Sequence, residues 1–325
     1  MSELSDSSGD VPSFFVTGAA GCIGRELVGQ LSTKACVTGM DLLPKPLGLG
    51  TTAWVEGDIL DESRYTSCLE GVDTVFHLAA KVHSVPGTPN EADQFWKVNL
   101  EGTRKLIKVA EKERVRKFVH VSTVAVHSST GGDLKDAYIE SKRAAEKVVL
   151  EFQNRMDVII VRPATVYGPY DRGNFFKLIN WIDRGFPPII GSGTNRKSVV
   201  FVRTLADALV FLSKQGENGR AYVVTDGRDP TMEEIVQTIS RALGVKNRWP
   251  AISPSMARGM AVVNEWLSEK LRFPRLLGCE MVEKLIEETI FDPTPLLSLG
   301  FSTRYSFKEG VGEAVRWYRS SGHRL

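Results

Sequence analysis

The chain has 325 residues, of which 42% are hydrophobic and 25% are charged, and its formal net charge is +2. This composition predicts a soluble globular protein with one large domain or two interlocked domains. The small net charge gives no reason to expect nucleic acid or an anionic membrane as a partner, and no apolar run reaches the length of a membrane span.

The cysteines, the histidines and the N-terminal segment bear on compartment and metal binding. The four cysteines include no C-x-x-C pair, so we expect free thiols in a reducing, cytoplasmic compartment. The five histidines show no H-x-x-H or H-E-x-x-H spacing, so we expect no metal site. Residues 1–12 lack the charged start and the apolar segment of a secretory signal, and we expect them to form a flexible tail.

The first expected strand, residues 14–17, runs into a glycine-rich turn and a helix. Gly18, Gly21 and Gly24 are spaced G-x-x-G-x-x-G. Gly18 permits a tight turn, Gly21 lets backbone N–H groups approach phosphates, and Gly24 lets the helix pack closely on the strand. The helix N-terminus favours negative charge. An ordinary β–α turn is the alternative, but the flanking strand and helix favour a pyrophosphate site. Its other expected members are Ala20, Cys22 and Ile23.

Strand-like and helix-like patterns then alternate as far as Pro163, which predicts an α/β fold with a doubly wound parallel sheet of the Rossmann type. The further strands are expected over residues 35–40, 53–56, 73–77, 117–121 and 157–161. The helices between them are expected over residues 62–69, 94–113 and 137–153.

Two aspartates follow the second and third of these strands. Asp41 lies 23 residues after Gly18, where a carboxylate accepts hydrogen bonds from the adenosine ribose and repels a 2′-phosphate. This position favours NAD over NADP. Asp58, with Ile59 after it, lies where it can bond the adenine edge, although a helix cap is the more ordinary explanation for Asp58 alone.

A tyrosine and a lysine one helical turn apart predict the reactive groups. Tyr138 and Lys142 lie on one face of the expected helix over 137–153, and a nearby ammonium lowers the pKa of a phenol toward working pH. The helix follows the strand that ends at Ser122 and Thr123. Ligands of open α/β sheets bind beyond the carboxyl ends of the strands, where a hydroxyl can orient a substrate oxygen. We therefore expect Thr123, Tyr138 and Lys142 to be catalytic.

Seven motifs in order carry a family resemblance: TGAAGCIG, GDILD, HLAA, VNLEGT (residues 98–103), VST, Tyr138-x-x-x-Lys142 and RPATVYGP (residues 162–169). Over residues 13–320 the chain resembles the extended short-chain dehydrogenase/reductase family, in its NAD-dependent epimerase/dehydratase group. The resemblance implies NAD as cofactor. It also implies that Thr123 positions the substrate oxygen, that Tyr138 exchanges its proton, and that Lys142 holds the nicotinamide ribose. Further implied cofactor contacts are Leu78, Ala79, Ala80, Asn99, Val121, Pro163 and Val166.

After Pro163 the pattern becomes irregular, which predicts a smaller, interleaved C-terminal substrate domain. We expect the dinucleotide-binding domain to comprise residues 13–167 with about 199–226, and the substrate domain to comprise residues 168–198 and 227–325. Residues 199–202 and 221–225 are expected to return to the main sheet. Helices are expected over residues 174–184, 205–214 and 231–244, the last with Thr231 and Glu234 as a capping box.

The resemblance also implies where a substrate would bind. Asn174, Arg196 and Lys197 fall where nucleotide-sugar enzymes hold the diphosphate and the sugar, and two cations suit a diphosphate. A solvated charge pair is the alternative for Arg196 and Lys197. Thr123 and Lys81 are further candidates, although an exposed lysine is the simpler explanation for Lys81. Residues 252–288 are apolar in places, which suits either a lipid-like substrate or internal packing.

We therefore expect an NAD-dependent epimerase or oxidoreductase that acts on a nucleotide-activated sugar, as a UDP-sugar 4-epimerase does. One alternative is a dehydrogenase of the 3β-hydroxysteroid type, and another is a non-catalytic dinucleotide sensor. Dehydration is disfavoured because no Asp-Glu pair accompanies Thr123. By resemblance we expect a homodimer that pairs through the helices over 94–113 and 137–153.

Overall fold

The computed structural model describes residues 11–50, 53–82, 86, 88–185, 189–245, 251–271 and 278–322. Most of the tail expected over residues 1–12 lies outside these ranges. The chain divides into two compact units. The first unit comprises Met1–Ala164, Val202–Val224 and Asp292–Ser302, and the second comprises Thr165–Phe201, Thr225–Phe291 and Thr303–Leu325.

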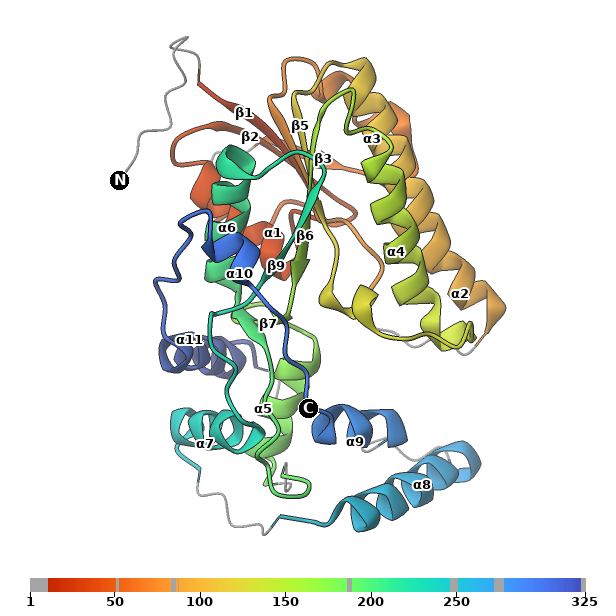
Figure 1. Cartoon of the computed structure of the whole chain (residues 1–325), viewed down its shortest axis with the longest axis vertical. Helices are drawn as coiled ribbons and strands as arrows, with labels where there is room; N and C mark the ends of the chain where they lie inside the picture. Colours follow the sequence, from red (N-terminus) through yellow and green to blue (C-terminus); the bar gives the residue numbers. More distant parts are fainter. Residues whose placement is uncertain are drawn as a thin grey trace. The chain divides into compact units, whose positions relative to one another are not determined.

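The first unit contains a seven-stranded parallel sheet with the strand order β3-β2-β1-β4-β5-β6-β9 (Figure 1). Its strands are β1 (Ser13–Thr17), β2 (Cys36–Asp41), β3 (Ala53–Glu56), β4 (Thr74–His77), β5 (Lys117–Val121), β6 (Asp157–Pro163) and β9 (Arg220–Val224). The order reverses between β1 and β4, which is where open α/β sheets bind their ligands. The predicted fold class is confirmed.

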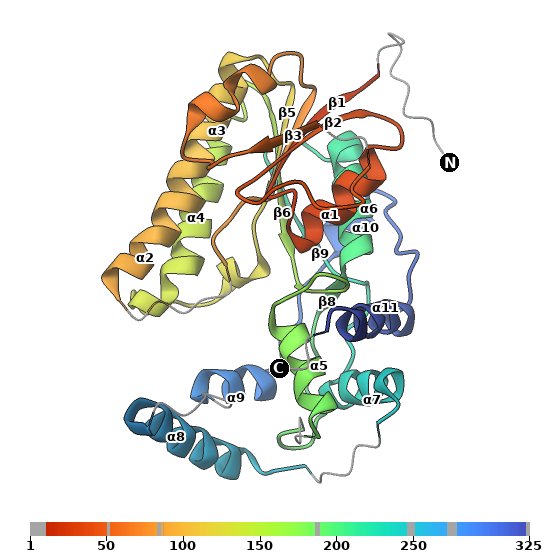
Figure 2. The same ribbon diagram turned by 180° about the vertical axis from the view of Figure 1, so that it is seen from behind.

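Helices cover both faces of this sheet (Figures 1 and 2). On one face lie α1 (Cys22–Leu31) and α6 (Val202–Gln215), which pack on each other, and the short α10 (Thr294–Leu297) lies beside β9. On the other face lie α2 (Pro89–Phe95), α3 (Thr103–Lys112) and α4 (Ala137–Leu150). Their apolar side chains pack on those of the strands, and one buried cluster contains Phe15 and Phe118 of the strands with Leu106 of α3 and Val149 of α4.

Two of the predicted helices of this unit differ from the structure. The helix expected over 62–69 is wrong, because the segment forms two short 3₁₀ turns, Glu62–Arg64 and Thr66–Cys68. Tyr65 separates them with φ −130°, since its ring is fully buried and its hydroxyl bonds to Ile59 O at 3.3 Å. The helix expected over 94–113 contains a π-helical stretch, Trp96–Gly102, between α2 and α3. Such insertions are frequent at functional sites.

The second unit holds a two-stranded parallel sheet and most of the remaining helices. Its elements are β7 (Thr165–Tyr167), β8 (Val199–Phe201), α5 (Asn174–Asp183), α7 (Met232–Leu243), α8 (Pro254–Leu271), α9 (Cys279–Ile286) and α11 (Phe307–Ser320). Residues 221–225 enter the main sheet through β9 as expected, but β8 pairs with β7. The reason is local, because Phe201 N donates to Asp226 Oδ1 at 2.8 Å while its ring packs against Tyr167.

Helix α7 begins and ends as its sequence predicts. Thr231 Oγ1 accepts a hydrogen bond from Glu234 N at 3.1 Å, and Gly244 ends the helix in the left-handed conformation, with φ +66°. The side chain of Glu234 pairs with Arg228 and does not close the expected capping box. The helix still gains the N-terminal cap and the C-terminal glycine.

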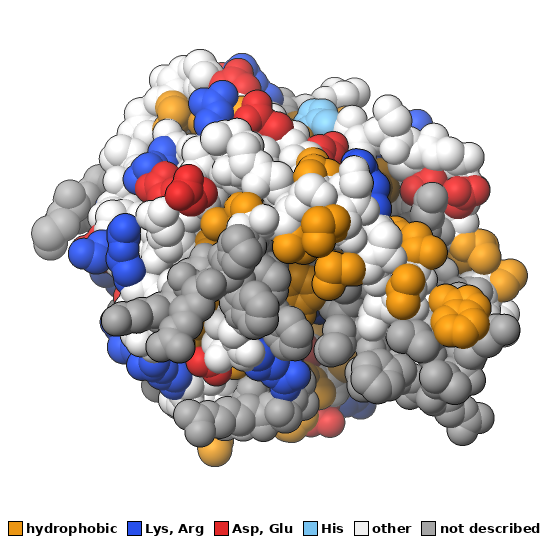
Figure 3. Space-filling model, turned by 90° about the horizontal axis from the view of Figure 1, so that it is seen from below, with side chains coloured by type: hydrophobic (Ala, Val, Ile, Leu, Met, Phe, Trp, Pro, Cys, Tyr) orange, Lys and Arg blue, Asp and Glu red, His pale blue; other side chains and the backbone are white. Residues whose placement is uncertain are grey.

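Over residues 254–266, the part of helix α8 whose side chains the structure describes, the larger apolar side chains lie on the outside. Its inner face is built from Ala257 and Ala261, which pack with Val282 and Ile190. Its outer face exposes 52% to 60% of Met256, Met260, Val262, Val263 and Trp266. Figure 3 views the molecule from below and shows hydrophobic side chains gathered on its surface. None of the helices in the described ranges is long and apolar enough to cross a bilayer.

Candidate active site

The glycine-rich turn joins β1 to α1 beside the end of β4. Gly18 has φ +67°, and a Cβ there would lie 2.8 Å from Ala79 N. A Cβ on Gly24 would lie 2.2 Å from Gly18 O. Gly21 N donates to Gly18 O at 3.1 Å, and Gly21 precedes α1 as its N-cap. The turn therefore has no side chain at the three places where strand, helix and ligand approach closely, which fits a dinucleotide pyrophosphate at the helix N-terminus.

Asp41 is connected to this turn from the end of β2. Its Oδ2 accepts a hydrogen bond from Ala20 N at 2.9 Å, and its Oδ1 accepts one from Leu43 N at 3.1 Å. Each carboxylate oxygen keeps a second lone pair for a ribose hydroxyl. Asp58 is exposed after β3 and accepts from Leu60 N, whereas the side chain of Ile59 is buried in the core. Only the backbone of Ile59 is available for the predicted adenine contact.

Lys142 lies on α4 and is 3% exposed. Its Nζ donates to Val121 O, at the end of β5, at 2.6 Å. Burial lowers the pKa of Lys142 to about 8, and the nearby carboxylate of Glu146 opposes that shift. The same ammonium, together with burial, lowers the pKa of His77 and of His120. The lysine is therefore fixed between the helix and the strand end.

Tyr138 lies one turn before Lys142, with its ring edge-on to Phe95 at a centroid distance of 6.2 Å. Burial raises the pKa of Tyr138, and a side-chain hydrogen bond with Thr123 opposes the shift. The Lys142 ammonium is directed at Val121 O, and its predicted effect on the pKa of Tyr138 stays a prediction. Thr123, Tyr138 and Lys142 nevertheless come together at the carboxyl end of β5.

Asn99, in the π-helical stretch, connects α4 to the segment after β4. Its Oδ1 accepts from Lys81 N at 2.7 Å, and its Nδ2 donates to Lys81 O at 3.2 Å and to Ser141 Oγ at 3.0 Å. Ser141 Oγ donates in turn to Tyr138 O at 2.9 Å. The Asn99 side chain is buried among these partners, so it holds the backbone around the candidate site and has little capacity left for a ligand. Lys81 Nζ lies 5.8 Å from the centre of the Phe95 ring.

His77 extends this network to β1, and the contacts fix its tautomer. Thr103 Oγ1 donates to Asn99 O at 2.6 Å, so it must accept from His77 Nε2 at 2.8 Å. His77 Nδ1 then accepts from Thr17 Oγ1 at 2.8 Å, and Thr17 accepts from the backbone N–H groups of the two residues after His77. Burial lowers the pKa of His77 to about 3, which agrees with a neutral ring.

The remaining predicted cofactor contacts lie at strand ends. Leu78, Ala79 and Ala80 follow β4 and are half-buried, and Pro163 is buried at the end of β6. Val166 is half-buried in β7 and belongs to the second unit. The predicted substrate contact Asn174 is exposed as the first residue of α5, also in the second unit.

The basic pair predicted to bind a diphosphate contacts the end of α9 and the segment after it. Lys197 Nζ donates to Lys284 O at 2.7 Å and also to Glu287 O. Arg196 lies beside Glu288, with Nε 3.8 Å from Oε2, and donates its backbone N–H to the same carboxylate. Burial lowers the pKa of Lys197. These contacts give both residues a structural role, and binding of a diphosphate by them stays a prediction.

An ion pair that we did not predict lies behind Lys142 on α4. Glu146, one turn after Lys142, accepts two hydrogen bonds from Arg162, at 3.0 and 2.6 Å. The Glu146 side chain is 7% exposed, and Arg162 Nη1 lies 3.4 Å from His127 Nε2. The four-residue spacing of Lys142 and Glu146 was the available signal, since it places both side chains on one helix face.

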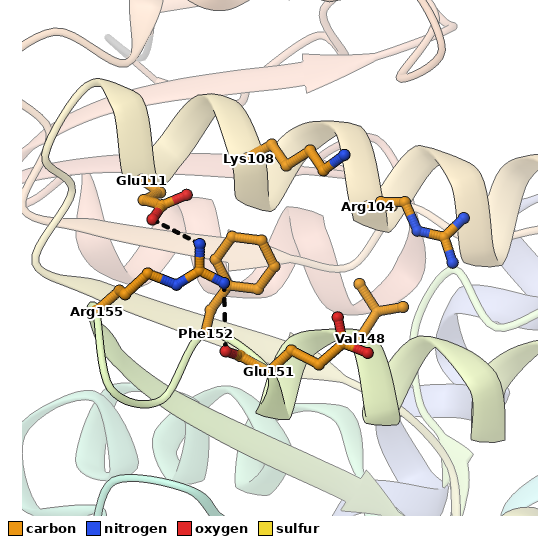
Figure 4. Close-up of a pocket in the computed structure, with 7 residues that line it drawn as sticks. All are labelled: Arg104, Lys108, Glu111, Val148, Glu151, Phe152 and Arg155. Atoms are coloured by element: carbon orange, nitrogen blue, oxygen red, sulfur yellow. Dashed lines mark hydrogen bonds and ion pairs between the residues drawn. The ribbon is translucent and has the colours of Figure 1, made fainter.

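A hollow of about 350 Å³ lies between α3 and α4 (Figure 4). Arg155 crosses it, pairing with Glu111 at 2.8 Å, and its guanidinium lies 4.1 Å from the centre of the Phe152 ring. Phe152 and Arg155 follow the end of α4, about 20 Å along the helix from Tyr138. The hollow is therefore separate from the candidate active site.

Comparison with known proteins identifies the family of the chain. Residues 14–225 match the model of the NAD dependent epimerase/dehydratase family. The chain belongs to this family. It is thus an enzyme of a family that uses NAD, and the glycine turn and Asp41 are the residues that fit this cofactor.

Individual relatives differ in the substrates that their names give. The chain is 28% identical to the N-acetyl-alpha-D-glucosaminyl-diphospho-ditrans,octacis-undecaprenol 4-epimerase of Escherichia coli O157:H7, over 80% of this chain and 82% of that one. It is 27% identical to the 3 beta-hydroxysteroid dehydrogenase/Delta 5-->4-isomerase of Mycobacterium tuberculosis, over 94% and 90%. Among solved structures, MoeE5 in complex with UDP-glucose and NAD is 25% identical with a TM-score of 0.68, over 95% and 99%.

Proposed function

We propose that this enzyme is an NAD-dependent epimerase of nucleotide-activated sugars that acts like a UDP-sugar 4-epimerase. The observation that carries the proposal is the convergence of three residues at the end of β5. Lys142 Nζ on α4 donates to Val121 O at 2.6 Å, Tyr138 lies one turn before Lys142, and Thr123 follows Val121 by two residues. A dinucleotide sensor has no need of these three groups together. The names of relatives that act on activated sugars support the choice of substrate class.

Each of the three residues has a defined task in this proposal. Bound NAD supplies hydride transfer to and from the substrate carbon. The Thr123 hydroxyl orients the sugar hydroxyl, and the Tyr138 phenol, once ionised, takes its proton and later returns it. The Lys142 ammonium stabilises the negative charge that forms on the Tyr138 oxygen. Because burial raises the pKa of Tyr138, this stabilisation must come from neighbouring groups.

The test is to purify the protein, denature it, measure released NAD, and assay UDP-sugars beside hydroxysteroids. Tightly held NAD with interconversion of a sugar would support the epimerase. Tyr138→Phe should abolish turnover and leave the affinity for NAD largely unchanged, because the phenol oxygen is removed while the glycine turn stays intact. Unchanged turnover would exclude Tyr138 as the proton-transfer group.

An apolar alcohol is the second candidate substrate, and the exposed face of α8 favours it. That face presents five large apolar side chains, and the hydroxysteroid relatives match almost the whole chain. In such a dehydrogenase Thr123, Tyr138 and Lys142 would have the same tasks, but the reduced cofactor would leave the enzyme after each turnover. Net NADH production from a sterol, without sugar interconversion, would support this candidate over the epimerase.

We also propose that the enzyme is a homodimer that pairs through α3 and α4. The surface of these helices carries charges of both signs, among them Arg104, Lys108 and Glu111, so two copies of it can be complementary in charge about a two-fold axis. Sedimentation of the purified chain tests this, and a monomer at micromolar concentration would contradict it.

A further inference from the structure

The hydroxyl of Thr123 lies on a short turn that leaves the sheet at the end of β5. On the strand side, Ser122 N donates to Val161 O at 2.7 Å. After Thr123 comes a single 3₁₀ turn, Val124–His127, in which Thr123 Oγ1 accepts from Ala125 N at 3.2 Å. One such turn has few internal hydrogen bonds, so contacts from outside must fix its position.

Those contacts come from the guanidinium of Arg143 on α4. Its Nε and Nη2 donate to Val126 O at 3.3 and 2.8 Å, and Nη2 also donates to Ser128 O at 2.9 Å. Its Nη1 donates to Glu140 Oε1 at 2.6 Å and to Thr130 Oγ1 at 3.4 Å. A guanidinium has five N–H donors, and these contacts use all of them.

This arrangement differs from an ordinary surface ion pair. The pair of Glu140 and Arg143 alone would contribute little, because both side chains are 31% exposed. The contacts to the two backbone carbonyls are charge-assisted hydrogen bonds, and they bind the end of the turn directly to the helix. A lysine ammonium lacks the planar fork that reaches both carbonyls at once.

Arg143 lies on the same helix as the phenol, five residues after Tyr138. We propose that Arg143 is a positioning residue that clamps the turn after Thr123 to α4 and so holds the Thr123 hydroxyl at the Tyr138 phenol. The inference rests on the proposed function for the tasks of Thr123 and Tyr138. The clamp itself can be tested without turnover.

The activity experiment compares Arg143→Met with Arg143→Lys, each made in the parent and in a Thr123→Val background. In the parent, Arg143→Met should lower kcat about 10- to 100-fold, since a displacement of about 1 Å costs that much, while the affinity for NAD stays unchanged. The kcat of Arg143→Lys should fall between those of the parent and of Arg143→Met. In the Thr123→Val background, Arg143→Met should change kcat less than about threefold, because the hydroxyl it positions is gone.

Arg155→Met is the matched control. Arg155 also pairs with a carboxylate, that of Glu111, and donates to a backbone carbonyl, Glu151 O at 3.3 Å, but it lies beyond the other end of α4. Its loss should lower thermal stability by a small amount, as expected for a more exposed ion pair, and it should leave kcat within about threefold of the parent. Equal losses of kcat in the two variants would show a general effect of stability and would overturn the proposal.

Hydrogen exchange of residues 122–130 provides the measurement that is independent of turnover. The amides of this segment should exchange faster in Arg143→Met than in the parent or in Arg155→Met. If Arg143→Met does not fold, the same comparison is made with Arg143→Lys, whose amides should also exchange faster than those of the parent. Unchanged exchange would overturn the clamp. Faster exchange without sugar turnover in the parent would retain the clamp and reject the proposed function.

Discussion

Replacing His120 with leucine should make the enzyme more resistant to acid. The ring of His120 is 1% exposed on β5, and neither of its nitrogens has a hydrogen-bond partner among the described residues. Burial, the Lys142 ammonium and His77 all lower its pKa well below 6.5. The folded protein therefore keeps the ring neutral at a pH where the unfolded chain protonates it. The contribution of the neutral His120 ring to the free energy of unfolding is therefore complete above pH 6.5. It is lost progressively as the pH falls below that value.

The size of the effect follows from proton linkage. Each pH unit below 6.5 costs about 1.4 kcal/mol for such a histidine, so between pH 7 and pH 5 the loss from His120 amounts to about 2 kcal/mol. Protonation of carboxylates between pH 7 and pH 5 changes the free energy of unfolding equally in the parent and in His120→Leu. It therefore cancels when the losses of the two proteins are compared. The variant gives up no hydrogen bond of the described structure, so its stability at pH 7 should not fall below that of the parent.

Urea denaturation of both proteins at pH 7 and pH 5 is the assay. The parent should lose about 2 kcal/mol more than His120→Leu between the two pH values. His127→Leu is the control, because His127 lies at the surface and should change this loss by less than about 1 kcal/mol. An identical loss in the parent and in His120→Leu would refute the reasoning, since it would mean that the folded protein accepts a proton at His120.

Three further predictions concern the turn, the second unit and the lysine. Gly24→Ala should weaken NAD binding about tenfold in calorimetry, because its Cβ meets Gly18 O at 2.2 Å, whereas Gly29→Ala on the same helix meets no atom within 4 Å and should not weaken it. Tyr167→Phe should lower the free energy of unfolding by about 1–3 kcal/mol in denaturant titrations, because it removes the donor to Asp226 Oδ2, and no loss would contradict this. Turnover should decline above about pH 8 as Lys142 loses its proton, and a profile that stays flat to about pH 10 would contradict that role.

The central strands of the main sheet could be read from the sequence because they are buried and apolar, whereas the edge strand β3 has no buried residue. The predicted ranges 53–56 and 117–121 coincide with β3 and β5. The segment 62–69 could not be read in this way, since its helical pattern is interrupted by Tyr65, whose position depends on the core below it. The position of β8 could not be read from the sequence either, because its apolar residues suit either sheet. In the structure β8 pairs with β7, and Asp226 accepts a hydrogen bond from Phe201 N of β8.

In the candidate site, too, some features follow from the sequence and others depend on the fold. The spacing of the glycines, of Asp41, and of Tyr138 with Lys142 is a local property of the chain, so the sequence alone predicts the residue types and the order in which they occur. The tertiary structure decides what each charged group contacts. It directs Lys142 at Val121 O and engages Lys197 with backbone carbonyls of α9 and the segment after it, and it clamps the turn after Thr123 with Arg143. These partners are distant in sequence, and long side chains select among them only when the backbone is folded.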